Sequence, residues 1–275
     1  ILYRVIVFRK MEQTALLFIG IPTALAVLVA ATPKARTVTG GILKAMTIAL
    51  LMAAPLLGEG FICIIMASPL FFVVGVLIGK LIDLSRRESR GTTIGILLLA
   101  FLPMSFEGAS ERFSFPREEV VTVVREVAAP AAEVERALGQ RLRLGESLPA
   151  FLRMGFPRPV GAEGAGLQVG DRRTIHFAGG EGHPGDLELE VAEAGPGFVR
   201  FRIVSDHSKI AHWLAWRASE VRWSAVDAAH TRVTWTLSYR RDLDPAWYFG
   251  PWERYAVGLA AEHLIRAGAT PESVE

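Results

Sequence analysis

The fold is decided by the segment TRVTWTLSYRRDLDPAWYFGPWERYAVGLAAEHLI (residues 231–265), in which an alternating pattern passes into a helical one. Successive residues of a strand point to opposite faces, so 231–240 is predicted as a strand with one apolar face. That face consists of Val233, Trp235, Leu237 and Tyr239. The residues after it predict a long helix, whose stripe at helical spacing is Trp252, Ala256, Leu259 and His263 or Leu264.

Five further segments are β-branched or alternating and are predicted as strands. They are 119–127, 171–178, 186–193, 198–204 and 217–226. A helix is predicted at 129–138 and a second short helix at 145–156, whereas the segment 155–166, rich in proline and glycine, is predicted as a loop. The strands have one apolar and one polar face, which indicates an antiparallel sheet that needs a cover. The long C-terminal helix is the amphipathic element that can cover it.

The residues before 107 differ in composition from the rest of the chain. Up to Phe106 there are ten Lys or Arg and four Asp or Glu, a net charge of +6, whereas the remainder carries −4. Four apolar runs lie in this first part, at 14–32, 41–58, 61–79 and 91–106. A helix needs about 20 apolar residues to cross a membrane. We therefore expect about four spans, or three if the shortest run, 91–106, does not cross.

These patterns divide the chain into a helical membrane region at 1–108, a linker at 109–118 and an α+β domain at 119–269. Short loops rich in Lys and Arg stay on the cytoplasmic side of a membrane. The loops after the first and third runs carry seven such residues, against five on the other side. This bias predicts an integral membrane protein whose C-terminal domain lies outside the cytoplasm.

The C-terminal domain resembles the START-like superfamily, also called SRPBCC, which includes polyketide cyclases and lipid-transfer domains. The resembling segments are VVREVAAPAAEVERAL (123–138), GFPRPVGAEGAGLQVGDRRTIHF (155–177), TRVTWTLSYRRDLDPAWYF (231–249) and the closing helix. The resemblance covers about 119–267, and together with the apolar runs it is similar to uncharacterised bacterial membrane proteins carrying such a domain. It implies a helix-grip fold, an antiparallel sheet wrapped on the long C-terminal helix, in a bacterial plasma membrane protein.

The resemblance also implies a cavity between the sheet and the C-terminal helix that holds a hydrophobic or amphipathic small molecule or a lipid. The residues expected around this ligand are Phe177, Phe201, Trp213, Trp216, Trp223, Trp235, Tyr239, Tyr248, Trp252, Tyr255, Leu259 and His263. The aromatic residues at the start of the helix have two other interpretations. They are either core packing, the usual role of large aromatic side chains, or anchors at a membrane interface, where Trp and Tyr are enriched.

Chemistry-bearing motifs are sparse in this sequence. Histidines lack the spacing of a metal site, the lone cysteine lies in an apolar run, and no nucleophile elbow or phosphate-binding loop is present, so no metal or cofactor is predicted. The acidic second part argues against nucleic acid as a partner. The candidate acid–base residues are Asp206, His207 and His263, the first two within the irregular stretch 205–216. That stretch is either a polar gate over the cavity or a solvated connection whose tryptophans close the barrel end.

Three functions are therefore carried forward. The first is a membrane-anchored module that binds a hydrophobic or amphipathic molecule or lipid. The second is an enzyme of the cyclase or dehydratase type that uses the acid–base residues above. The third is a protein-interaction module whose cavity is filled by its own side chains. Their discriminating feature is the cavity: empty and apolar for binding, lined by convergent polar groups for catalysis, absent for interaction.

Overall fold

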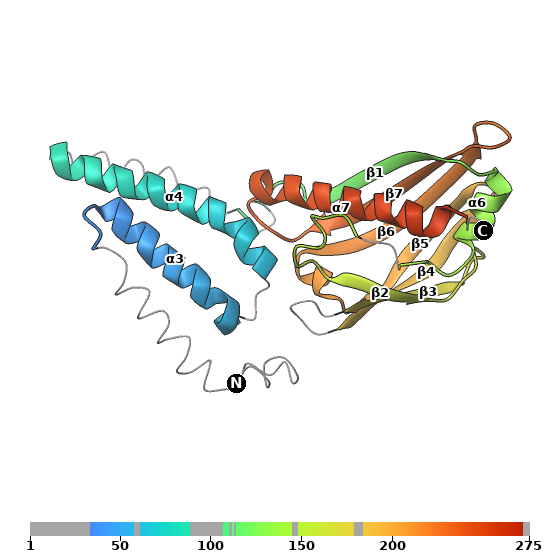
Figure 1. Cartoon of the computed structure of the whole chain (residues 1–275), viewed down its shortest axis with the longest axis horizontal. Coiled ribbons are helices and arrows are strands. Elements are labelled where there is room, and N and C mark those ends of the chain that lie inside the picture. The colour runs from blue at the N-terminus through green and yellow to red at the C-terminus, as the bar shows by residue number, and fades with distance from the viewer. Residues whose placement is uncertain are drawn as a thin grey trace. The chain divides into compact units, whose positions relative to one another are not determined.

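The computed structural model describes residues 34–57, 61–88, 107–109, 112, 114–144, 148–178 and 184–271. The chain forms two compact units, Ile1–Ser105 and Phe106–Glu275 (Figure 1). The first unit is helical, and the second contains the sheet and the helices packed on it. Each unit is described separately below.

The N-terminal unit contains an antiparallel helix pair, α3 (Val38–Leu57) and α4 (Phe61–Glu88). The backbone N–H groups of Val38 and Thr39 donate to the carboxylate of Asp83 at 2.8 and 3.0 Å, which joins the start of α3 to the last part of α4. These bonds satisfy donors that the first turn of a helix leaves free.

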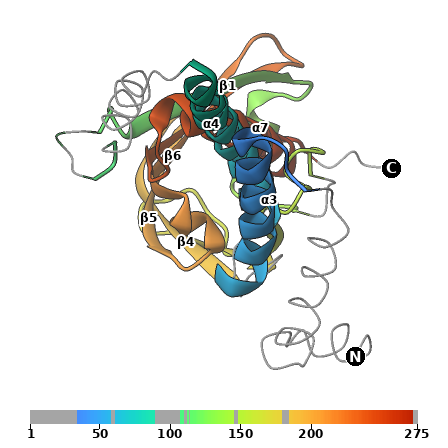
Figure 2. The ribbon, with the colours of Figure 1, turned by 90° about the vertical axis from the view of Figure 1, so that its left-hand side faces the viewer.

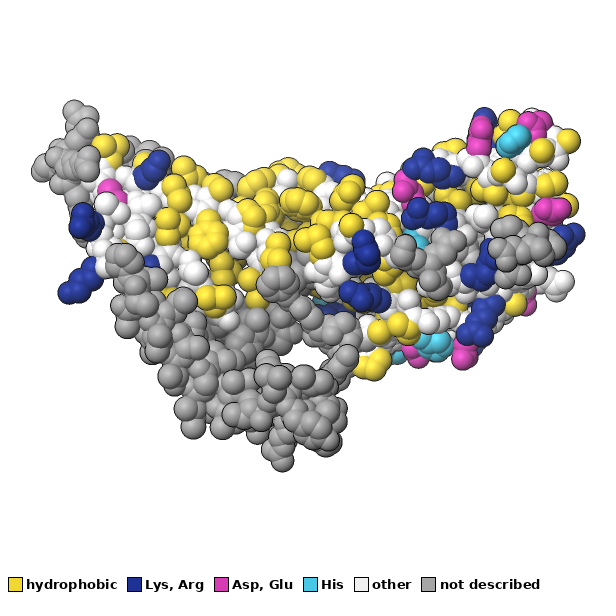
Figure 3. Space-filling model, in the orientation of Figure 1, with side chains coloured by type: hydrophobic (Ala, Val, Ile, Leu, Met, Phe, Trp, Pro, Cys, Tyr) yellow, Lys and Arg dark blue, Asp and Glu magenta, His cyan; other side chains and the backbone are white. Residues whose placement is uncertain are grey.

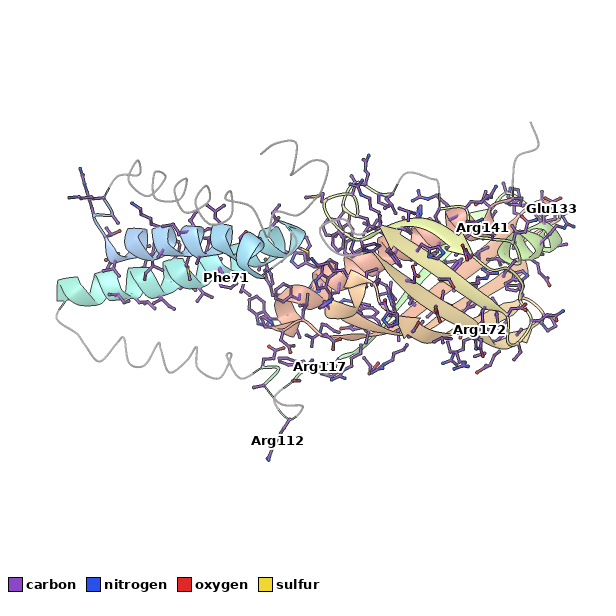
Figure 4. All side chains as sticks on the ribbon, turned by 90° about the horizontal axis from the view of Figure 1, so that it is seen from below. Phe71, Arg112, Arg117, Glu133, Arg141 and Arg172 are labelled. Carbon is purple, nitrogen blue, oxygen red and sulfur yellow. The ribbon has the colours of Figure 1, made fainter. Side chains whose placement is uncertain are left out.

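Both helices coincide with predicted spans, 41–58 and 61–79, and apolar side chains cover much of their visible surface (Figure 3). Exposed apolar residues include Phe71, which is labelled on α4 in Figure 4. Within the described residues, one helical segment, Ile64–Leu84, is long and apolar enough to cross a membrane. The predicted spans 14–32 and 91–106 lie outside the described residues. The described part of the chain therefore contains one or two apolar helices, and the expectation of four membrane spans is not supported.

Two glycines of α4 form the contact with α3. A Cβ atom added at Gly79 would lie 2.6 Å from the Cα of Thr39, and one at Gly75 would lie 2.4 Å from the sulfur of Met46. Both distances are too short for non-bonded atoms. At Gly79 the neighbour is backbone, so α3 and α4 approach closely there because Gly79 lacks a side chain, whereas at Gly75 the neighbour is the flexible side chain of Met46. Small residues four apart have this role in helix pairs within membranes.

We predict that Gly79→Ala destabilises the helix pair, because its methyl group would collide with the backbone of α3. Overpacking of this kind costs about 1–3 kcal/mol. Gly41→Ala is the matched control, since a Cβ there meets no atom within 4 Å and Ala favours a helix over Gly. Denaturant unfolding of the detergent-solubilised chain measures both variants, and equal stability of the two would contradict the packing role of Gly79.

The C-terminal unit is built on a seven-stranded antiparallel sheet with the order β1-β7-β6-β5-β4-β3-β2. The strands are β1 (Glu118–Val127), β2 (Arg158–Glu163), β3 (Arg172–Ala178), β4 (Gly185–Gly195), β5 (Phe198–Asp206), β6 (Leu214–Ala225) and β7 (Thr231–Arg241). Six of these strands lie at the predicted segments. The sheet curls around the axis of the unit, as the view in Figure 2 shows for β4, β5 and β6.

The strand β2 corrects the prediction of a loop at 155–166. It is an edge strand that pairs only with β3, and its register shifts between Pro159 and Gly161. Proline is tolerated at a sheet edge, where its missing N–H interrupts no ladder. The predicted second helix at 145–156 is also wrong in its described part: residues 150–155 form turns, with the N–H of Arg153 donating to the carbonyls of Pro149 and Ala150.

Two helices pack on the sheet: α6 (Ala131–Leu138), and α7 (Ala246–Ala269), which covers the concave face. The predicted alternation of β7 is confirmed, because Val233, Trp235, Leu237 and Tyr239 are all buried. The fold is therefore the curled sheet with a C-terminal helix that the sequence predicted.

The predicted stripe of α7 is confirmed at Ala256, His263 and Leu264, which line the space between helix and sheet, but not at Trp252 and Leu259. Val257, Ala261 and Ile265 are buried, whereas Trp252 is 39% exposed and Leu259 only half-buried. The helix is thus rotated so that its largest aromatic residues leave the core. The local reason is the preceding turn region, where Phe151 stacks on Trp252 with ring centroids 6.1 Å apart.

Candidate ligand-binding cavity

A cavity of about 170 Å³ lies between the concave face of the sheet and α7. Its walls come from every strand except β1, from α7, from residues within 142–144 and 148–157, and from the connection between β5 and β6. For comparison, an apolar cavity of about 150 Å³ in another protein holds benzene. This space therefore accepts at least a ring-sized apolar group.

The walls of the cavity are almost entirely apolar. The aliphatic lining comes from strands and helix alike, for example Ile175, Leu187 and Leu237 from the sheet and Val257 and Leu264 from α7. Three lining residues carry a charged, hydroxyl or imidazole group, namely Arg173, Ser219 and His263. Ser219 accepts a hydrogen bond from the indole N–H of Trp235 at 2.9 Å, and His263 is 3% exposed.

Arg173 is the charged residue of the cavity wall and is 4% exposed. Its Nη2 donates to the carbonyl oxygens of Leu138, at the end of α6, and of Gly166, the latter at 2.9 Å. The guanidinium lies 5.0 Å from the ring centroid of Phe201. Burial lowers the pKa of Arg173 to about 10, so the side chain remains a cation at neutral pH.

Six of the twelve residues expected around a ligand line the cavity. They are Phe177, Phe201, Trp213, Trp216, Trp235 and His263. Contact between these residues and a ligand stays a prediction.

The other six expected residues lie outside the cavity lining, for local reasons. They are Trp223, Tyr239, Tyr248, Trp252, Tyr255 and Leu259. Trp223 turns to α6, where its indole N–H donates to Glu135 at 3.4 Å. Tyr239 is fully buried behind Trp216, with ring centroids 6.0 Å apart.

The remaining residues that were expected around the ligand but lie outside the cavity lining belong to α7. Tyr248 packs between Trp247 and Phe249, whereas Trp252 and Tyr255 lie against Phe151 near the surface. The aromatic cluster at the start of α7 is thus neither the main core nor the cavity wall. Leu259 lies on a half-buried side of the same helix.

Aromatic contacts nevertheless link this surface cluster to the cavity. Phe151 contacts Phe156 with ring centroids 5.2 Å apart, and Phe156 contacts Trp213 edge-on at 5.6 Å. Phe156 and Trp213 both line the cavity, whereas Trp252 at the other end of the series is partly exposed. A continuous aromatic path therefore runs from the surface near the start of α7 to the cavity.

The candidate acid–base residues are not brought together in the cavity. His263 lines it, but Asp206 and His207 do not. Asp206 accepts a hydrogen bond from the backbone N–H of Ser208 at 2.9 Å and so shapes the turn before the short helix η4 (Lys209–His212). Ile210 and the two tryptophans of this stretch face the cavity instead. Within the described residues, no group of three His, Cys, Asp or Glu could hold a metal ion.

Sequence reasoning missed Arg173, although the signal was present. In RRTIHF (172–177) the alternation that places Ile175 and Phe177 on one face also places Arg173 there. An arginine on an apolar face is easily interpreted as the solvated end of a strand. Only its burial in the folded unit distinguishes the two possibilities.

A second group of buried charges lies outside the cavity, near the start of α7. Arg241 is fully buried and pairs with Asp244 at 2.6 Å, and Arg117 also pairs with Asp244. Glu253 is 6% exposed, and neither of its carboxylate oxygens has a hydrogen-bond partner among the described residues. Burial raises the pKa of Glu253 to about 8, an effect that the nearby cation of Arg241 partly offsets. Glu253 is therefore largely protonated at neutral pH.

We predict that Glu253→Gln stabilises the C-terminal unit at alkaline pH and has little effect at acidic pH. Folding raises the pKa of Glu253 from 4.5 to about 8, so the stability from its protonation is full below about 4.5 and is lost as the pH rises to 8. Gln has no proton to lose. Thermal unfolding of the full chain from pH 5 to pH 9 should give a melting temperature difference that grows with pH. Glu133→Gln, at an exposed position on α6, is the control and should show no such trend.

Comparisons with known proteins find likeness at the level of structure alone. No family model matches this chain, and no curated protein matches it either. A START superfamily protein from Mycobacterium smegmatis is 14% identical with a TM-score of 0.38, over 54% of this chain and 92% of that one. Norcoclaurine synthase from Thalictrum flavum is 14% identical with a TM-score of 0.37, over 54% and 85%.

A third similar structure is the Zhui aromatase/cyclase from a Streptomyces species. It is 17% identical with a TM-score of 0.33, over 56% of this chain and 99% of that one. The curled antiparallel sheet and its C-terminal helix are established for this chain by its own strand register.

Proposed function

We propose that the C-terminal unit binds a hydrophobic or amphipathic small molecule, or the apolar end of a lipid, between the sheet and α7. The observation that carries this proposal is the cavity itself, enclosed by apolar side chains. Apolar walls without a partner lose dispersion contacts that a bound apolar group restores. Transfer of such a group from water is favourable by about 25 cal/mol for each Å² buried.

We further propose that the N-terminal unit holds this cavity at a membrane. The apolar segment Ile64–Leu84 supports this part of the proposal. The Lys/Arg bias of the loops supports an extracytoplasmic C-terminal unit in a bacterial plasma membrane. Attachment next to a lipid phase raises the effective concentration of apolar ligands without any new contact.

The two other functions have less support from the geometry. A cyclase or dehydratase would use His263, His207 or Asp206 as its acid–base residue, and of these three only His263 lines the cavity. A protein-interaction module was expected to have its cavity filled by its own side chains, whereas this cavity contains unfilled space. Binding is therefore the function that the described residues favour.

We predict that Ala260→Trp abolishes binding, because Ala260 lines the cavity from α7 and an indole there would occupy it. Leu259→Trp is the matched control, since the adjacent residue of the same helix lies outside the walls. Native mass spectrometry of the detergent-purified chain, with extraction and identification of co-purifying lipids, detects the natural ligand. Displacement of a fluorescent apolar probe measures affinity, which should fall at least tenfold for Ala260→Trp only.

The controls keep this test interpretable. Circular dichroism should show the same secondary structure for wild type and both variants. The proposal is contradicted if no apolar molecule co-purifies and no probe binds, or if the two variants bind the probe equally well.

A further inference from the structure

Resting on the proposed binding function, we infer that the ligand carries a carboxylate that pairs with Arg173 at the α6 end of the cavity. The observation behind this inference is a buried cation in an otherwise apolar wall. The inference names the chemical class of the ligand as an amphipathic carboxylic acid.

The hydrogen bonds of Arg173 hold its side chain in position, but they do not neutralise its positive charge. Nη2 holds the end of α6 and the turn at Gly166 against β3, which is a structural role. The carbonyls at the end of a helix carry only partial negative charge. The Nε atom is inaccessible to solvent and has no hydrogen-bond partner among the described residues. One N–H of the guanidinium is thus left without a partner among the described residues, in a residue that lines the cavity.

Two other arginines of the same unit, the fully buried Arg241 and the partly buried Arg117, share a carboxylate partner. Arg241 and Arg117 both pair with Asp244. For Arg173, no carboxylate in the described part of the chain lies within 4.0 Å. Asp171 acts on it only at longer range, and its Oδ2 accepts a hydrogen bond from the N–H of Gln168. A buried charge without a counter-ion is strongly unfavourable, so an anion from outside the chain fits this site.

The cavity is polar at one end and apolar along its length. Arg173 is the second residue of β3, and Figure 4 shows its neighbour Arg172 toward the α6 end of the unit, away from Arg117. Ile175 and Phe177 follow it on the same face of the strand and line the cavity. Phe156 and Trp213 form the wall where the aromatic path from the surface arrives. A ligand with its carboxylate at Arg173 would therefore lay its apolar part along these side chains.

A carboxylate fits the site better than a phosphate does. It carries a single charge, which matches the single charge of one guanidinium. A phosphate monoester brings up to two charges, and among the described residues Arg173 is the only arginine or lysine in the cavity wall. His263 and Ser219 are the other polar residues in the described wall of the cavity.

The experiment compares octanoate with methyl octanoate and octyl phosphate, each displacing a fluorescent apolar probe from the detergent-solubilised full chain. We expect octanoate to bind at least tenfold more tightly than methyl octanoate. Arg173→Met should remove this preference. Arg172→Met should keep it, because Arg172 points outward on the same strand and pairs with Glu190. Arg173→Lys, which keeps the charge, should retain part of it.

A second measurement uses the wild-type protein, so the inference remains testable if Arg173→Met does not fold. The preference for octanoate should disappear as the pH falls through the carboxylate pKa of about 4–5. Equal binding of octanoate and its ester at pH 7 overturns the inference and leaves the binding function intact. Tighter binding of octyl phosphate than of octanoate overturns the carboxylate assignment. Failure of all three to displace the probe, or of the probe to bind, contradicts the binding function itself.

Discussion

The small side chains that α7 turns toward the sheet are the constraint on which the C-terminal unit depends. A curled antiparallel sheet has a concave apolar face that something must cover, and α7 covers it with Ala256, Val257 and Ala260. Closely packed interiors leave few voids, so a helix with larger residues here would have filled the space. The cavity is thus a consequence of which face of α7 meets the sheet. The aromatic residues that would have filled it lie on other sides of the helix.

The unit treats its buried charges in two different ways. Near the start of α7, Arg117 and Arg241 share Asp244, which links β7, α7 and the segment before β1. At the other end of the sheet, the hydrogen-bond partners of Arg173 among the described residues are all backbone carbonyls. The first arrangement is complete without a ligand and stabilises the fold. In the second arrangement, Nη2 of Arg173 has hydrogen-bond acceptors, but no carboxylate among the described residues neutralises the positive charge. This difference separates a purely structural cation from one that lines a cavity.

The aromatic cluster at the start of α7 differs from two of its three interpretations, core packing and cavity wall, whereas its role as an anchor at a membrane interface stays a prediction. Trp252 and Tyr255 pack on Phe151, which contacts Phe156, and Phe156 lines the cavity. The cluster is neither core nor wall but a partly exposed extension of the wall to the surface.

In the N-terminal unit, Gly75 and Gly79 lie in a contact between two helices of the same chain, since both face α3.

Local patterns were sufficient to predict most of the C-terminal fold. Alternation in segments such as 231–240 depends only on successive residues, so six strands and the covering helix could be predicted from sequence. The edge strand at Arg158–Glu163 could not, because its prolines are acceptable only where no further strand pairs, a property of the whole sheet. The same holds for the site: the sequence placed Arg173 and Phe177 on one strand face, but not what that face meets. Tertiary structure alone decided the rotation of α7, the cavity and the isolation of Arg173 from carboxylates, because each results from contacts between segments distant along the chain.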